Sequence, residues 1–150
     1  MKTPTAEFST SGLITEIRPG EYVFGDLNNT RLGACSEDQI ALFVAATVVS
    51  DWVPDQVILD AGTKALSREG NPELGYGGVA GTNAVLAKLN EYHGFLALPA
   101  GELRPSVGTV VPVVPNHVCP VVINFDELIV TDSAGTSLQR WPVDARGYLS

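Results

Sequence analysis

The amino-acid sequence predicts an all-β protein, a small barrel or sandwich of about nine or ten short strands. Three observations lead to this prediction. Short β-branched and aromatic runs recur at fairly regular spacing, turn residues such as glycine and proline separate them, and almost no segment has the spacing of an amphipathic helix. Many short strands divided by turns are typical of barrels and sandwiches.

The predicted elements follow in chain order. Residues 1–11 are polar and are expected to form a loose leader, and residues 12–150 are expected to form one domain. Residues 67–78 are rich in glycine, asparagine and proline and predict a long loop. Alternating or β-branched apolar runs, closed by turn residues, predict strands at residues 13–17, 21–25, 57–60, 84–89, 95–98, 108–114, 118–124, 128–131 and 138–143.

Two segments carry additional signals. Residues 36–50 are predicted to begin as a helical turn capped by Ser36 and to continue as a strand, because β-branched residues accumulate through positions 44–49. Pro112 lies inside the predicted strand 108–114. Because proline cannot donate to a strand ladder, this strand is expected to lie at an edge, to bend or to carry a bulge.

Length, charge and cysteine content restrict the class of protein. A chain of 150 residues can form one domain with a substantial core. The formal net charge of −8 disfavours nucleic acid as a partner. Neither an apolar signal segment nor an apolar run of about 18 residues occurs, so we expect no membrane span and a cytoplasmic protein. Cys35 and Cys119 are then expected to be reduced.

His117 and Cys119 are the strongest candidates for a site. Two positions apart in an extended strand, they would project from the same face. Imidazole nitrogen and thiolate sulfur suit zinc, and a site with so few protein ligands stays open to substrate. The alternative is ordinary packing, because cysteine and histidine are often buried and satisfied in a core.

The segment Pro115–Pro120, with the sequence PNHVCP, resembles the metal-binding signature of the D-serine dehydratase / D-threonine aldolase family. Five further segments resemble the C-terminal domain of that family in the expected order, and the resemblance covers nearly the whole chain. They are TEIRPGEYVFGD (residues 15–26), ATVVS (46–50), LDAGTKALS (59–67), LNEYHG (89–94) and WPVDARG (141–147).

The resemblance implies a β-barrel domain of a pyridoxal-phosphate lyase with the alanine-racemase type of fold. In this family an N-terminal α/β barrel carries the Schiff-base lysine, and the metal ligands of the second domain fall on His117 and Cys119. Cysteine at the second position resembles the zinc-dependent dehydratase branch, whereas aldolase-type relatives often have aspartate there with manganese or magnesium. The implied role of zinc is to bind the β-hydroxyl group of a D-amino acid.

The chain departs from the family pattern because it has no room for an α/β barrel, which needs about 200 residues or more. None of its lysines, Lys2, Lys64 and Lys88, matches the cofactor lysine. We therefore expect a domain that is inactive alone, that uses pyridoxal phosphate only through a separate barrel domain, and that pairs with a cofactor-bearing α/β barrel chain or self-associates. The alternative is a non-catalytic interaction or small-ligand-binding module.

Four other residues are candidates for substrate or outer-sphere contacts. Tyr22 either reaches an active-site cleft or packs as a half-buried strand residue. His93 is either a site residue or a turn histidine bonded to the backbone. Asp60 and Lys64 either belong to a site or form an aspartate-stabilised turn.

Overall fold

The computed structural model describes residues 15–16, 18–70 and 73–148. The predicted leader at residues 1–11 lies outside the described residues, as does most of the strand predicted at 13–17. The two described residues of that strand, 15 and 16, are not in a strand.

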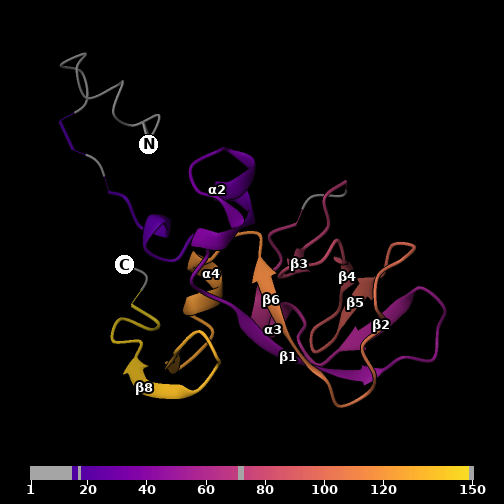
Figure 1. Cartoon of the computed structure of the whole chain (residues 1–150). Helices are drawn as coiled ribbons and strands as arrows, with labels where there is room; N and C mark the ends of the chain where they lie inside the picture. The colour runs from indigo at the N-terminus through magenta and orange to yellow at the C-terminus, as the bar shows by residue number, and fades with distance from the viewer. Residues whose placement is uncertain (1–14, 17, 71–72, 149–150) are drawn as a thin grey trace.

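Six antiparallel strands close into a barrel in the order β1-β2-β5-β4-β3-β6 (Figure 1). Their bounds are β1 Val44–Ser50, β2 Gln56–Leu59, β3 Gly77–Val79, β4 Val85–Leu89, β5 Gly94–Ala97 and β6 Val110–Pro115. Strands β7 (Glu127–Thr131) and β8 (Ser137–Pro142) form a separate hairpin. The predicted β-barrel is confirmed, although the described residues form eight strands in place of about nine or ten.

Two of the predicted strands are wrong. Residues 21–25 contain a 3₁₀ turn, η2 (Glu21–Val23), and residues 118–124 contain a short helix, α4 (Cys119–Val122). Pro120 lies in the first turn of α4. Backbone N–H groups in the first turn have no acceptor within the helix, so the N–H that proline lacks costs no helical hydrogen bond. The β-branched residues of the segment predicted a strand, but the proline and the packing of Val121 in the core favour the helical turn.

Pro112 fits into β6 without the predicted bulge. Residues 44–47 of β1 pair with residues 110–113 of β6 in continuous register. The carbonyl of Pro112 accepts a hydrogen bond from the N–H of Ala80, just beyond the end of β3 at Val79. The N–H that proline lacks would lie on this same side, so the only bond that is absent lies just beyond the end of β3.

The barrel interior follows the two-residue period of its strands. Val44, Ala46 and Val48 of β1 are buried while the residues between them are more exposed. Short helices α3 (Thr63–Leu66) and α4 add Leu66, Val118 and Val121 to the same core. The core thus reaches from the strands into the segment that follows β6.

Two short elements precede the barrel. Helix α2 (Leu27–Arg31) begins at Asp26, and the 3₁₀ turn η3 (Glu37–Gln39) begins at Ser36, which forms a capping box with Gln39 as the predicted cap suggested. Figure 1 shows that α2 and α4 lie near the end of β6, while the hairpin of β7 and β8 projects to one side. None of the short helices in the described part of the chain has the length and apolar character of a membrane-spanning segment.

Candidate metal centre

The connection from β6 to α4 carries both predicted metal ligands. Strand β6 ends at Pro115 and Cys119 begins α4, so the predicted extended geometry of His117 and Cys119 is wrong. Val118 between them has helical backbone angles (φ −73°, ψ −34°) and a buried side chain. The bend nevertheless brings the two ligand side chains together, and a third group, the carboxylate of Glu21, joins them. Ligand atoms of all three lie within 4.8 Å of one another.

Asp26 fixes the position of the bend between β6 and α4. Its carboxylate is fully buried, and Oδ2 accepts a hydrogen bond from the N–H of Val118 at 3.0 Å. The other oxygen, Oδ1, accepts from the backbone N–H and the side-chain amide of Asn29, both at 2.8 Å. One carboxylate therefore caps α2 and holds the residue between His117 and Cys119.

Asn116 provides a second set of hydrogen bonds that holds the connection between β6 and α4. Its side-chain amide donates to the carbonyls of Gly75 at 2.8 Å and Glu69 at 3.2 Å, and its Oδ1 accepts from Arg31 at 3.0 Å. Its own carbonyl accepts from the N–H of Asn28. Because Asn116 is buried and each of its side-chain polar atoms is bonded, the backbone preceding His117 has little freedom to move.

His117 lies between two carboxylates. Its Nε2 is 2.9 Å from Oε1 of Glu21, and its Nδ1 contacts Oε2 of Glu69. The side chain is 24% exposed, so the imidazole is held by protein but remains reachable from solvent. Glu21 is itself oriented, because its Oε2 accepts from the side-chain amide of Asn29 at 2.8 Å.

The surroundings of Cys119 disfavour a free thiolate. Partial burial raises the pKa of the thiol, and the negative charges of Glu21, Asp26 and Glu69 raise it further. Both Cys35 and Cys119 are free thiols in the structure. A bound cation would have the opposite effect on the thiol. Its positive charge stabilises the thiolate of Cys119 and is itself stabilised by the nearby carboxylates.

The donor set suits a borderline cation. An imidazole nitrogen, a thiol sulfur and a carboxylate oxygen are all found among zinc ligands, and three protein ligands leave one of four positions open. Sequence reasoning missed Glu21 and Glu69, which lie far along the chain from His117. The segment GEYVFGD contains Glu21, but its pattern indicates the tyrosine after it, and not the glutamate, as a site residue.

The other predicted residues lie outside this cluster. Tyr22 is 73% exposed in η2, so it is neither in a strand nor half-buried. Asp60 follows β2 and accepts from the N–H of Thr47 at 2.7 Å, which ties β2 to β1. His93 precedes β5, and its backbone is bonded to Asn90.

Lys64 lies on α3 and makes only local contacts among the described residues. Its Nζ is 2.5 Å from the hydroxyl of Tyr92, 4.0 Å from the centre of that ring and 3.4 Å from Glu91. The hydrogen bond to Tyr92 is the main reason that the pKa of Lys64 is raised. The structure therefore gives Asp60 and Lys64 structural contacts and does not bring either to His117.

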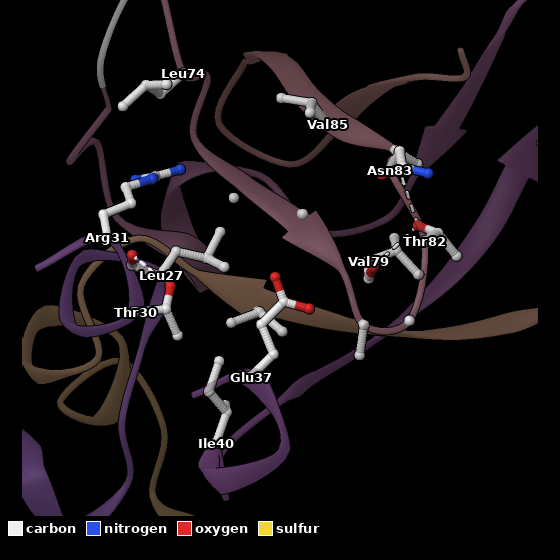
Figure 2. A pocket seen from close by; sticks show the side chains of 16 residues that line it. Leu27, Thr30, Arg31, Glu37, Ile40, Leu74, Val79, Thr82, Asn83 and Val85 are labelled. Carbon is white, nitrogen blue, oxygen red and sulfur yellow. Dashed lines mark hydrogen bonds between the residues drawn. The ribbon is translucent and has the colours of Figure 1, made fainter. Parts of the chain in front are cut away.

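A cavity of about 320 Å³ lies between α2, η3 and the hairpin of β3 and β4. Figure 2 shows the carboxylate of Glu37 pointing into the space between Leu27 and Val79, with Arg31 at one side and Asn83 at the other. Within the described part of the chain, neither Arg31 nor Glu37 has an oppositely charged partner within 4 Å. The cavity thus combines apolar walls with two charges.

Comparison with known sequences identifies related chains. A family model described as "Putative serine dehydratase domain" matches residues 41–131. The chain is 36% identical over 149 residues to a D-threonine aldolase of an Arthrobacter species, covering 97% of this chain and 38% of that enzyme. It is also 38% identical over 132 residues to the uncharacterized protein Rv1414 of Mycobacterium tuberculosis, covering 83% of this chain and 98% of that protein.

Solved structures agree with the sequence comparison. A D-threonine aldolase from Filomicrobium marinum matches with a TM-score of 0.78 and 31% identity over 93% of this chain. A D-threo-3-hydroxyaspartate dehydratase from Delftia sp. HT23 matches with a TM-score of 0.73 and 32% identity over 86% of this chain. In both cases the chain spans 38% of the length of the enzyme.

Two variants of a D-threo-3-hydroxyaspartate dehydratase are also similar in structure. One has a histidine replaced by alanine, and the other, in a metal-free form, has a cysteine replaced by alanine two positions further along that chain. The spacing of those two residues equals the spacing of His117 and Cys119.

Proposed function

This chain belongs to the family of serine dehydratase domains, and on that premise we propose that it is a metal-binding β domain that holds zinc through His117 and Cys119. The substrate class we propose is a β-hydroxylated D-amino acid, because the enzymes that the chain resembles are named for the cleavage or dehydration of such compounds. The chain spans 38% of the length of the D-threonine aldolase, so we propose that catalysis needs a further, cofactor-bearing chain.

One observation carries the proposal. The imidazole, the thiol and a carboxylate converge at a solvent-reachable corner whose backbone is held by Asp26 and Asn116. Because Asp26 and Asn116 are buried and fully hydrogen-bonded, they hold the ligand side chains in place before a metal binds. This lowers the free-energy cost of metal binding. Ordinary packing of a cysteine and a histidine requires neither these hydrogen bonds nor the convergence of the three groups.

Each residue has a separate part in this function. His117 and Cys119 would hold the ion, Asp26 positions the backbone between them, and Asn116 positions the backbone that precedes His117. Zinc at this place would supply a Lewis acid for a β-hydroxyl group, and pyridoxal phosphate on a separate α/β barrel chain would supply the electron sink. The exposed side of His117 leaves room for a substrate oxygen.

Zinc analysis of the variant His117→Ala tests the proposal. After incubation with zinc and removal of the excess, the wild-type chain should retain about one zinc per chain, and His117→Ala should retain almost none. The variant His93→Ala is the matched control, because it removes the other histidine of the chain, and it should retain zinc like the wild type. Equal zinc content in wild type and His117→Ala, whether high or negligible, would contradict the proposal.

We also propose that the hairpin of β7 and β8 mediates self-association. Every residue of β8 is exposed, including Leu138 at 60%. Leu128 packs against the core, so its neighbour Ile129 points to the opposite face and is 46% exposed. A two-stranded hairpin is only marginally stable without a further layer. Because Rv1414 is matched over 98% of its length, a domain of this kind occurs in a chain of similar size, and a second copy is the partner we propose.

Light scattering at micromolar concentration should therefore give a dimer mass for the wild type. The double variant Ile129→Ser/Leu138→Ser should shift the mass toward that of a monomer, because it removes two exposed apolar side chains of the hairpin. The control Leu32→Ser/Leu103→Ser replaces two exposed leucines elsewhere and should leave the dimer unchanged. A monomeric wild type, or a dimer that the hairpin variant does not weaken, would argue against this interface.

A further inference from the structure

We propose that Glu21 is a third protein ligand of the metal centre and that Glu69 is the partner that orients the imidazole of His117. The inference rests on the proposed metal site and extends it. With three ligands from one chain, this domain would bind a divalent cation by itself and would keep one coordination position for a substrate.

The distances place Glu21 in the coordination shell. Its Oε1 lies 2.9 Å from Nε2 of His117, and one ligand atom from each of Glu21, His117 and Cys119 lies within 4.8 Å of the other two. Zinc bonds of about 2.0–2.2 Å to nitrogen and oxygen put neighbouring ligand atoms of a tetrahedral site about 3.3–3.5 Å apart. A small opening of the contact between Glu21 and His117 is then sufficient to admit the ion.

The two carboxylates have different places. Glu21 contacts Nε2 and belongs to the group of three with Cys119, whereas Glu69 contacts Nδ1 and is not part of that group. If Nε2 binds the cation, Nδ1 carries the proton and donates it in a hydrogen bond to Glu69. This carboxylate–histidine–metal arrangement is the usual second layer of a zinc site, and it sets both the tautomer and the orientation of the ring.

Glu21 is held in a position suited to binding. The amide of Asn29 donates to Oε2 of Glu21 and to Oδ1 of Asp26, both at 2.8 Å. The second carboxylate oxygen of Glu21 is thereby occupied, which leaves Oε1 for the cation. Asn29 thus couples the third ligand to Asp26, the residue that positions Cys119.

The charges also favour a divalent ion. A thiolate from Cys119 and a carboxylate from Glu21 neutralise two positive charges, and the imidazole contributes a neutral donor. With a histidine and a cysteine alone, one positive charge would remain and two coordination positions would be open. With Glu21, the ligand number equals that of open zinc sites with three protein ligands.

Zinc competition titrations and cobalt(II) spectra of Glu21→Gln test the inference. Glutamine keeps the size and the contact with Asn29 but loses the carboxylate, so zinc affinity should fall by about 10- to 100-fold and the visible cobalt bands should shift. Glu69→Gln should weaken zinc binding about tenfold and leave the cobalt bands unchanged, because the ligand atoms stay the same. Glu37→Gln, which changes an exposed carboxylate outside the centre, should have wild-type values.

The outcomes separate this inference from the function on which it rests. Unchanged affinity in Glu21→Gln, or weaker binding with unchanged cobalt bands, would show that Glu21 is not a ligand and would overturn the inference. If His117→Ala and Cys119→Ala lose zinc in the same series, the proposed metal site survives that result. If those two variants bind zinc like the wild type, the metal site itself is wrong.

Discussion

Replacing Asp26 by asparagine is expected to lower the free energy of unfolding by about 3 kcal/mol, because a buried carboxylate that accepts three hydrogen bonds loses one of its two acceptor oxygens. The N–H of Val118 donates to one oxygen, and the two N–H groups of Asn29 donate to the other. The amide of asparagine would direct its own N–H groups at one of these donors. Urea unfolding, followed by circular dichroism, measures the loss.

The control for this variant is Asp38→Asn. Asp38 is also acidic and lies within the short helical element η3, but it is exposed. Its replacement should change the free energy of unfolding by no more than about 0.5 kcal/mol. Similar losses in the two variants would show that burial and the three hydrogen bonds of Asp26 are not what stabilises the fold.

Asp26→Asn should also weaken zinc binding, although Asp26 lies outside the group of three ligands. The bond to the N–H of Val118 holds the bend that brings Cys119 toward His117. If that bond is lost, the ligands are less well placed before the ion binds. Zinc titrations under conditions in which the variant is folded separate this effect from the loss of stability.

The barrel could be predicted from the sequence because its strands follow simple rules. The alternation of buried and exposed residues along β1, and the turn residues between the strands, are local signals that tertiary packing preserves. The same rules failed at residues 118–124. A run of β-branched residues predicts a strand, but the buried contacts of Val118 and Val121 with residues distant in sequence favour a helical turn.

The candidate site was predicted only in part for the same reason. His117 and Cys119 are close in sequence, so their spacing drew attention even though the expected strand geometry was wrong. Glu21 and Glu69 come from two other segments, and no local spacing relates them to His117. The positioning roles of Asp26 and Asn116 could not be predicted either, because the burial of a polar side chain depends on the assembled fold.

The glycines of the segment GYGG, residues 75–78, have a structural explanation. Such a run resembles a phosphate-binding loop, but the sequence after it does not predict the helix that such a loop requires, so the pattern does not indicate a phosphate site. In the structure, Gly75 has a φ of +72°, and a side-chain carbon added there would lie 2.6 Å from the carbonyl oxygen of Leu86. The carbonyl of Gly75 also accepts from Asn116, which precedes His117. The glycine is therefore needed for the close approach of this loop to β4 and to Asn116.

Gly75→Ala should accordingly destabilise the protein by about 3 kcal/mol or more, because alanine meets both an unfavourable backbone conformation and a backbone oxygen that cannot move without displacing β4. Gly81→Ala is a matched control. Gly81 has the same φ of +72°, but an added side-chain carbon would have no neighbour within 4 Å. It should cost only about 1–2 kcal/mol, the conformational penalty alone. Urea unfolding of both variants measures the difference, and equal losses would mean that close packing at Gly75 contributes nothing to the stability of the fold.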